Sequence, residues 1–469
     1  MRDAILGVVA LAVAACATPR VRSGTGLRQV SYAVDPPAPG SWLLGVEATF
    51  EGSPSALLVA PDQPDTFGSV ASVDAGAVVP AERRGTGWWV PSCQSRCTVR
   101  YTVDLEAMAA SCGRMDCARR IGDAVLGTVD TWMLRPDPMG DAVVHVHVVG
   151  AQASRFVTGL RRDPSGGYVF QARELAEASY GAFGSFRSDD LVVSGANLRV
   201  AFLGQPLALG DAGALQWIRE AASCEVRLFG HFPVDATVFV VPVPGRAGVV
   251  FGRVMSLSGA SVVLLFGTAT TADEQRDDWV VVHELSHLGC PSFVDEGHWL
   301  EEGLATYYEP ILRERCGWMS EAALWSHFGS EMDRGLRHNG DPASLEQRDD
   351  IDATYWGGAL FAFLADVRIR EATRNARSLD DVLRAVLARS GDATHTARVA
   401  DFIRIGDDVT GTDVLSRLYD SWALRGENAD LPALWRSLGV NLRQGHDAGF
   451  ESAAPLAAVR RAIGSGDKN

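Results

Sequence analysis

The amino-acid sequence predicts an α+β protein with a β-sandwich at its N-terminus, a mixed region of strands and helices in the middle, and a helical C-terminal part. Three observations support this. The 469 residues are too many for one small domain. Residues 41–195 contain short alternating or β-branched segments interrupted by glycine and proline. From about residue 318 onward, apolar residues recur at helical spacing.

The composition is that of a folded, acidic protein. Apolar residues make up 47% and charged residues 22%, which excludes a disordered chain. The formal net charge is -15, so we expect no nucleic-acid partner, because phosphate binding needs clustered Lys and Arg.

The first residues indicate export. Residues 4–15 form an apolar stretch that is too short to span a membrane and has the length of a signal-peptide core. The sequence Val13-Ala14-Ala15-Cys16 resembles the bacterial lipobox. This resemblance implies a lipoprotein signal peptide over residues 1–15, a lipid on Cys16 that attaches the protein to a membrane, and a place in the bacterial cell envelope, with the catalytic domain in the periplasm or at the cell surface. Ala17 stands after the cysteine, where an acidic residue would favour the inner membrane, so we expect the outer membrane. Residues 16–40, rich in Pro and Gly, read as a tether.

The predicted strands of the N-terminal domain, residues 41–195, are 42–50, 55–60, 70–79, 98–105 and 142–149. The cysteines fit an oxidising compartment. Cys93, Cys97, Cys112 and Cys117 predict two disulfides with three possible connectivities. Cys290 and Cys316, which flank the motif region, are candidates for a third bridge, with the connectivity left open, and Cys224 is then a buried thiol.

The middle region, residues 196–310, contains the predicted metal ligands and the predicted general base. We expect strands at 198–203, 236–241 and 260–266, and a helix from Asp211 to about Ser223. Thr271 and Glu274 have the spacing of a capping box and predict the start of the next helix.

That helix contains the H-E-x-x-H pattern His283-Glu284-Leu285-Ser286-His287. Residues i and i+4 share one helical face, so both imidazoles can reach one metal ion. Glu284 follows the first histidine and lies where it can accept a proton from water at the metal. A catalytic zinc site needs a third protein ligand, and the spacing leaves Glu301 and Glu302 both open.

The segment Trp299-Leu300-Glu301-Glu302-Gly303-Leu304-Ala305 resembles the W-x-x-E-G-x-A helix of the gluzincins. This resemblance implies a thermolysin-like zinc peptidase domain, one Zn²⁺ per chain, and Glu302 as the third ligand. Further on, Tyr355-Trp356-Gly357-Gly358 resembles the aminopeptidase-N-like gluzincins and the glycyl aminopeptidase family. The match implies that Tyr355 donates a hydrogen bond to the oxyanion. Residues 311–450 are expected to form a helical domain and residues 451–469 a tail.

The predicted function is zinc-dependent hydrolysis of peptide bonds in a peptide or protein substrate. In one respect the sequence departs from those aminopeptidases, which hold the substrate amine with a glutamate in a Gly-rich segment upstream of the zinc helix. The matching residues here, 253–260, contain no carboxylate. Two alternatives stay open: an aminopeptidase restricted to N-terminal residues, and a metal-containing surface binding protein with little turnover.

Overall fold

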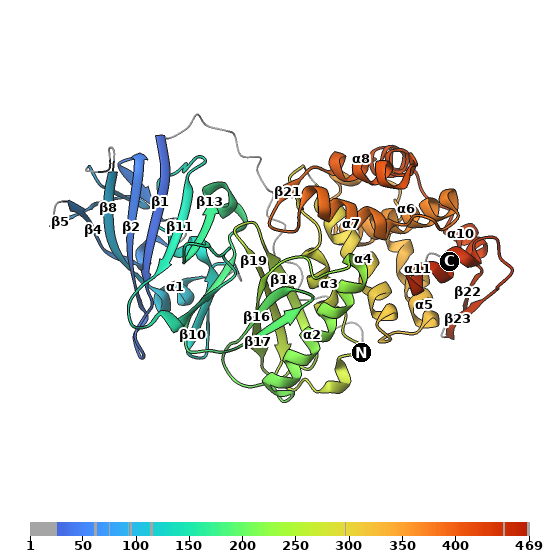
Figure 1. Cartoon of the computed structure of the whole chain (residues 1–469), viewed down its shortest axis with the longest axis horizontal. Helices are drawn as coiled ribbons and strands as arrows, with labels where there is room; N and C mark the ends of the chain where they lie inside the picture. The colour runs from blue at the N-terminus through green and yellow to red at the C-terminus, as the bar shows by residue number, and fades with distance from the viewer. Residues whose placement is uncertain are drawn as a thin grey trace.

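The computed structural model describes residues 26–466 apart from 61–62, 75, 92, 94–95, 113–115, 296 and 444–445. The predicted signal peptide and Cys16 lie outside these residues. Figure 1 shows a strand-rich N-terminal part at one end, a central sheet with helices, and a helical part at the other end. The β-rich N-terminal part and the helical C-terminal part of the prediction are thereby confirmed. Among the residues described, no helix has both the length and the apolar character needed to cross a membrane.

Two sheets of the N-terminal part share one buried core, to which Val30, Phe50, Val99 and Phe183 contribute. The larger sheet runs in the order β13 (Tyr168–Gln171), β11 (Val143–Val148), β1 (Gly26–Asp35), β2 (Leu43–Ser53), β8 (Arg96–Asp104), β4 (Phe67–Asp74) and β5 (Ala77–Pro80). The smaller sheet runs in the order β12 (Phe156–Thr158), β14 (Tyr180–Gly184), β10 (Ala124–Thr128) and β9 (Ala118–Ile121). A third, short sheet contains β3 (Leu57–Val59), β7 (Gly87–Trp89) and β6 (Glu82–Arg84). Helix α1 (Leu105–Ser111) follows β8.

Strand β1 lies in the stretch for which the sequence predicts a tether. It pairs with β2 and β11, and its alternate residues Val30, Tyr32 and Val34 are buried. The flanking prolines and glycines conceal this short alternation in the sequence. The predicted strand 70–79 is likewise two strands, β4 and β5, joined as a hairpin.

The central sheet has the order β15 (Arg187–Val193), β16 (Ala196–Phe202), β17 (Ala236–Val243), β19 (Ala260–Gly267) and β18 (Val249–Met255). Strands β16, β17 and β19 are parallel, and β18 is an antiparallel edge strand. The domain boundary predicted between residues 195 and 196 falls inside the β15–β16 hairpin.

The two faces of this sheet are buried against different partners. Successive side chains of a strand point to opposite faces. Leu198 and Val200 belong to the core shared with α2 (Gly210–Phe229) and the later helices. Ala201 and Leu203 belong to a second core, which includes Tyr180 and Ala182 of β14. The N-terminal part therefore packs directly on the sheet that carries the candidate site.

The helix with the H-E-x-x-H pattern is α3 (Val280–His287). The predicted capping box of Thr271 and Glu274 exists, but it caps a separate 3-10 turn, Ala272–Glu274. The start of α3 is stabilised instead by Asp278, whose carboxylate accepts from the Val281 amide at 3.1 Å. The predicted helix start is therefore wrong by several residues, because residues 275–279 interrupt the helix.

The helical part begins with α4, which spans His298–Arg315. It continues with α5 (Glu321–Glu331), α6 (Gly358–Thr373), α7 (Leu379–Ser390), α8 (Val399–Thr410), α9 (Val414–Leu418), α10 (Leu431–Leu438) and α11 (Ala457–Ser465). Two short strand pairs accompany it, β20 (Ser292–Phe293) with β21 (Thr396–Ala397) and β22 (Val440–Arg443) with β23 (His446–Phe450). The expected tail contains α11, which buries Val459 and Ile463 because these apolar residues share one helical face.

The disulfides correct part of the cysteine prediction. The two N-terminal bridges join Cys93 to Cys97 and Cys112 to Cys117. The third bridge joins Cys224 to Cys316, and Cys290 is the buried free thiol. The expected Cys290–Cys316 bridge is therefore wrong. Helix α2 packs against α4 and brings the Cα atoms of Cys224 and Cys316 to 5.9 Å, a tertiary contact over 92 residues of sequence.

Candidate metal centre and active site

Helix α3 presents both histidines of the motif on one face. The imidazole rings of His283 and His287 lie 5.0 Å apart, as expected for residues one turn apart. Their side chains are 4% and 16% exposed. The remaining face of α3 buries Val281, Val282 and Leu285 in the main core, which holds the helix against the sheet.

Helix α4 decides between the two consecutive glutamates. Glu302 turns toward α3, and its Oε2 lies 3.1 Å from Nε2 of His283 and 3.6 Å from Nε2 of His287. Glu301 turns away and accepts a hydrogen bond from the backbone amide of Phe293. Neighbours on a helix diverge by about 100°, so only one of the two can face the histidines.

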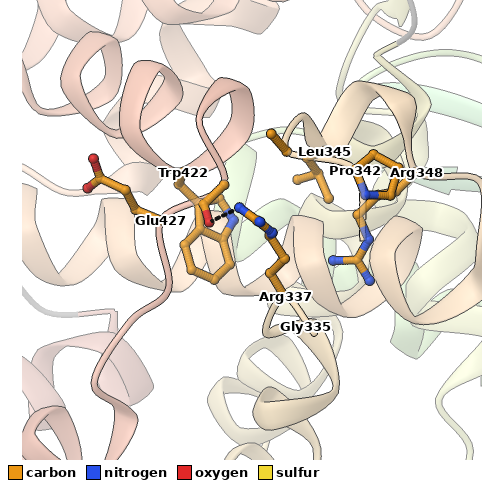
Figure 2. Close-up of a pocket in the computed structure, with 9 residues that line it drawn as sticks. Gly335, Arg337, Pro342, Leu345, Arg348, Trp422 and Glu427 are labelled. Carbon is orange, nitrogen blue, oxygen red and sulfur yellow. Dashed lines mark hydrogen bonds between the residues drawn. The ribbon is translucent and has the colours of Figure 1, made fainter. Parts of the chain in front are cut away.

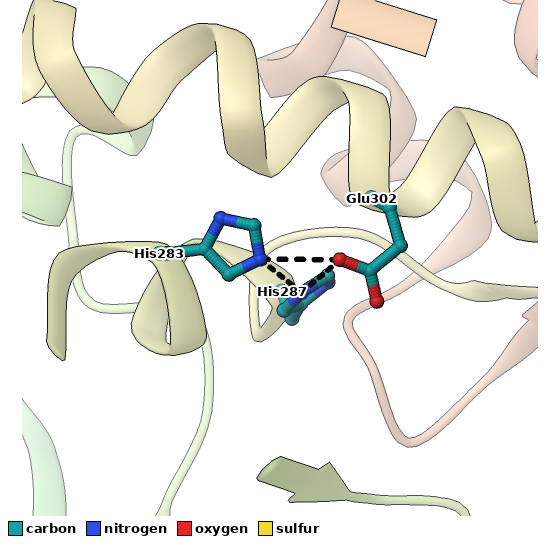
Figure 3. A group of neighbouring side chains, drawn as sticks. All are labelled: His283, His287 and Glu302. Atoms are coloured by element: carbon teal, nitrogen blue, oxygen red, sulfur yellow. Dashed lines mark hydrogen bonds and ion pairs between the residues drawn. The ribbon is translucent and has the colours of Figure 1, made fainter. Parts of the chain in front are cut away.

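The triad of His283, His287 and Glu302 has the chemistry and the size of a metal site (Figure 3). One ligand atom from each residue lies within 4.8 Å of the others, and the two Nε2 atoms are 3.3 Å apart. Tetrahedral zinc with bonds of about 2.0–2.1 Å would set its ligand atoms about 3.3 Å apart. Two ring nitrogens and a carboxylate oxygen that converge in this way are the ligand set of a catalytic zinc site. The residues therefore fit Zn²⁺, and no other such group is found in the described parts of the chain.

Glu284 lies against the edge strand of the central sheet. A Cβ atom on Gly252 of β18 would lie 2.2 Å from Cγ of Glu284, so any side chain at that position would displace the glutamate. Burial raises the pKa of Glu284 to about 8, and the charge of Glu302 adds to this, whereas His287 and Arg253 act in the opposite direction. Glu284 is thus a buried carboxyl group of raised basicity beside the metal ligands.

Tyr355 lies beside the triad, against the ring of His283. It lies in a π-helical segment, Asp352–Gly357, which leads into α6, and its ring stacks on that of His283 with centroids 6.0 Å apart. Burial raises its pKa, and so do the charges of Glu302 and Glu284 and a side-chain hydrogen bond to Glu302. The phenol therefore stays protonated and is a hydrogen-bond donor at the site.

The close approach of α4 and α6 places Tyr355 there. A Cβ atom on Gly303 would lie 2.3 Å from the Cα atom of Gly358, and one on Gly358 would lie 1.9 Å from the carbonyl oxygen of Trp299. The two helices thus meet backbone to backbone, next to Glu302 on one side and Tyr355 on the other.

Tyr307 and Tyr308, which follow Glu302 on α4, point elsewhere. Their hydroxyls donate to Asp366 and Asp380 at 2.9 Å, and both side chains are fully buried. They hold α4 against the helical part and do not compete with Tyr355 for a role at the triad.

A small cavity lies next to the segment that carries Tyr355, but it does not include the triad. It is bordered by Gly335, Arg337, Leu345 and Trp422 (Figure 2), and its volume of 10 Å³ suits about one water molecule. Trp422 donates to the carbonyl of Gly357 at 3.4 Å. This region supports the π-helical segment and is too small for a substrate.

The structure adds residues that the sequence analysis did not assign to the site. Gly252 of β18 lies against Glu284, the charge of Arg253 on the same strand opposes the rise in the Glu284 pKa, and Glu225 of α2 accepts a hydrogen bond from Ser286 of α3 at 2.9 Å. An isolated glycine in a strand is a signal for a close backbone approach, so Gly252 carries such a signal. No local pattern marks Arg253 or Glu225.

Comparison with solved structures finds several that share this fold. An aminopeptidase N family protein from Idiomarina loihiensis matches with a TM-score of 0.65 and 16% identity over 91% of this chain and 82% of that chain. An M1 zinc metallopeptidase from Deinococcus radiodurans matches with a TM-score of 0.52 and 15% identity over 88% of this chain and 96% of that chain. A mutant two-domain M1 zinc metallopeptidase bound to L-arginine matches with a TM-score of 0.50 and 15% identity over 87% of this chain and 95% of that chain.

This chain has the fold of M1 zinc metallopeptidases. At these identities the similarity establishes the architecture, and the chemistry depends on the residues described above. No family model matches the chain, and none of the curated proteins compared with it matches either.

We expect Glu302→Ala to lower zinc occupancy strongly and Glu301→Ala to retain it, because only Glu302 faces the histidines. Metal analysis of both purified variants after dialysis checks this. Glu301→Ala serves as the matched control: it leaves the Phe293 amide without its partner, at a cost in stability of about 1–3 kcal/mol. Loss of zinc from Glu301→Ala alone would show that the ligand assignment is off by one residue.

Proposed function

We propose that this protein is a zinc-dependent peptidase that hydrolyses peptide bonds. The observation that carries the proposal is that three metal ligands converge while a phenol stacks on one of them and a buried carboxyl group follows it on the same helix. The shared fold with M1 zinc metallopeptidases supports the same reaction class. The gluzincin type of site, with two histidines and a glutamate, agrees with this arrangement.

Zinc bound by His283, His287 and Glu302 would supply a Lewis acid that polarises the scissile carbonyl and acidifies water. The carboxylate of Glu284 accepts a proton from the attacking water and delivers one to the leaving nitrogen. The hydroxyl of Tyr355 donates to the carbonyl oxygen as negative charge develops on it. The free edge of β18 beside Glu284 offers backbone groups with which an extended peptide can pair.

An aminopeptidase is the second candidate, favoured by the aminopeptidase N family protein that shares the fold. We place it second because β18 and the turn that follows it bear no carboxylate to hold a substrate amine. Matched peptides with free and acetylated N-termini distinguish the two: an aminopeptidase cleaves only the free form.

We expect Glu284→Gln to retain zinc and to lose turnover by two to four orders of magnitude, the usual effect of removing a positioned acid–base group. The amide has the size of the carboxylate, so the contact with Gly252 is preserved. Zinc content and turnover of a mixed peptide library, measured on the same preparation, check this. Equal turnover of wild type and variant would exclude the assigned role.

Tyr355→Phe should reduce kcat about a hundred- to a thousand-fold with little change in melting temperature, because the lost hydrogen bond strengthens only in the transition state. Tyr307→Phe and Tyr308→Phe are the matched controls. Each removes one of several donors from a buried aspartate, so they should lower the melting temperature and spare kcat. If Tyr355→Phe kept its kcat and Tyr307→Phe or Tyr308→Phe lost it, the oxyanion donor would be a tyrosine of α4.

We further propose that the mature protein begins at Cys16 and is a lipid-anchored protein of the bacterial cell envelope, in the outer membrane. The basis is the lipobox-like sequence, together with Ala17 at the position where an acidic residue would favour the inner membrane. Stable anchoring needs more than one acyl chain, which lipid on both the thioether and the new amine would supply. Cys16→Ser should therefore release the protein from the membrane fraction or block its processing. A soluble wild-type protein cleaved at another residue, identified by mass spectrometry, would contradict the proposal.

A further inference from the structure

Trp279, the residue before α3, has a large apolar side chain that the proposed mechanism does not use. Its side chain is 51% exposed, although tryptophan is among the residues that gain most from burial. It occupies the N-cap position of α3 and makes no side-chain capping bond there. Ser, Thr, Asp and Asn stabilise this position best, and here the carboxylate of Asp278 accepts from the Val281 amide instead. Neither core packing nor helix capping therefore explains a tryptophan at position 279.

Helical geometry places Trp279 on the side of α3 that carries the metal ligands. The backbone amide of His283 donates to the Trp279 carbonyl at 3.0 Å, so Trp279, His283 and His287 follow one another at intervals of four residues along one face. The indole ring packs edge to face against the His283 ring, with the centroids 5.5 Å apart and the planes at 84°. A solvent-exposed aromatic surface therefore adjoins one of the metal ligands directly.

Exposed apolar side chains recur on the segments that form the site, although these segments are far apart in sequence. Twelve large apolar side chains are exposed in the described parts of the chain, and five of them lie on such segments. Besides Trp279 they are Val250 and Phe251, which precede Gly252 on β18, Val294 between α3 and α4, and Ile351, one turn before Tyr355. Single exposed apolar residues are ordinary, but their accumulation beside one site is typical of a binding surface.

The position of the Trp279 ring fits a substrate residue next to the reacting bond. A carbonyl group that reaches the triad lies within about one residue of the indole, because the indole adjoins the His283 ring. The side chain of the neighbouring substrate residue can therefore lie on the indole face, where apolar atoms of both partners are removed from water. Val250, Phe251 and Ile351 favour the same kind of occupant, since none of them could replace the hydration that an ammonium group loses.

We propose that the exposed face of Trp279 is one wall of an open subsite that selects an apolar side chain at the substrate residue flanking the scissile bond. This inference rests on the proposed peptidase function and adds the class of peptide that the site prefers. Trp279 thereby determines specificity and takes no part in proton transfer.

The test identifies, by mass spectrometry, the bonds that zinc-loaded protein cleaves in a mixed peptide library. Wild type should favour Leu, Met and Phe over Ser and Gln about five- to twenty-fold at one of the two residues that flank the cleaved bond, because an open surface buries only part of a side chain. Trp279→Ser and Trp279→Gln should both bring this ratio near one, and Trp279→Phe should keep most of it. The ratio is taken within each variant, so a change in zinc occupancy or overall turnover leaves it unaffected.

Leu43→Ser is the matched control, since Leu43 is an exposed apolar side chain of β2 in the N-terminal part. It should keep the wild-type ratio. The inference would be overturned, with the proposed function left standing, by a wild type without apolar preference or by a preference that persists in Trp279→Ser. A preference for Lys or Arg that Trp279→Ser abolishes would overturn it as well. Absence of any cleavage by zinc-loaded wild type would overturn the proposed function and this inference together.

Discussion

Helices α4 and α6 meet at Gly303 and Gly358, and the rest of the candidate site depends on how closely they approach. Neither position has room for a Cβ atom, because the facing backbone lies within van der Waals distance. Glu302 precedes one glycine, and Tyr355 lies a turn before the other. A larger side chain at the crossing would separate the two helices and with them the third metal ligand and the phenol.

Polar contacts in the core hold helix α4 in place through Tyr307 and Tyr308. Tyr307 and Tyr308 bond to Asp366 and Asp380, and both aspartates form ion pairs with buried arginines. Buried charges are costly unless they are paired and hydrogen-bonded, so these groups contribute less to stability than an apolar core would. Their directional bonds do fix the rotation of α4 about its axis. That rotation decides which of two consecutive glutamates faces the histidines.

Strand β18 contributes to the site through two adjacent residues with opposite properties. Gly252 has no side chain, and this leaves the space that the Glu284 side chain occupies. Arg253 contributes a positive charge on the other face of the strand, in a protein with a net charge of -15. Since strand residues alternate between faces, one edge strand borders the proton-transfer group on one face and carries the arginine on the other.

The sequence by itself determined the features that depend on local periodicity. The spacing of His283 and His287 places them on one helical face wherever the helix lies. Alternation located several of the longer strands, among them β2, β8, β17 and β19, but not β1, which its proline-rich flanks conceal, or the edge strand β18. The resemblance to the gluzincins named Glu302, which spacing left undecided. Only the tertiary structure decided the Cys224–Cys316 bridge, the packing of the expected tail on the core, and the place of Gly252 against Glu284. These features join segments far apart in the chain, and their geometry is set by how whole elements pack, which no short stretch of sequence encodes.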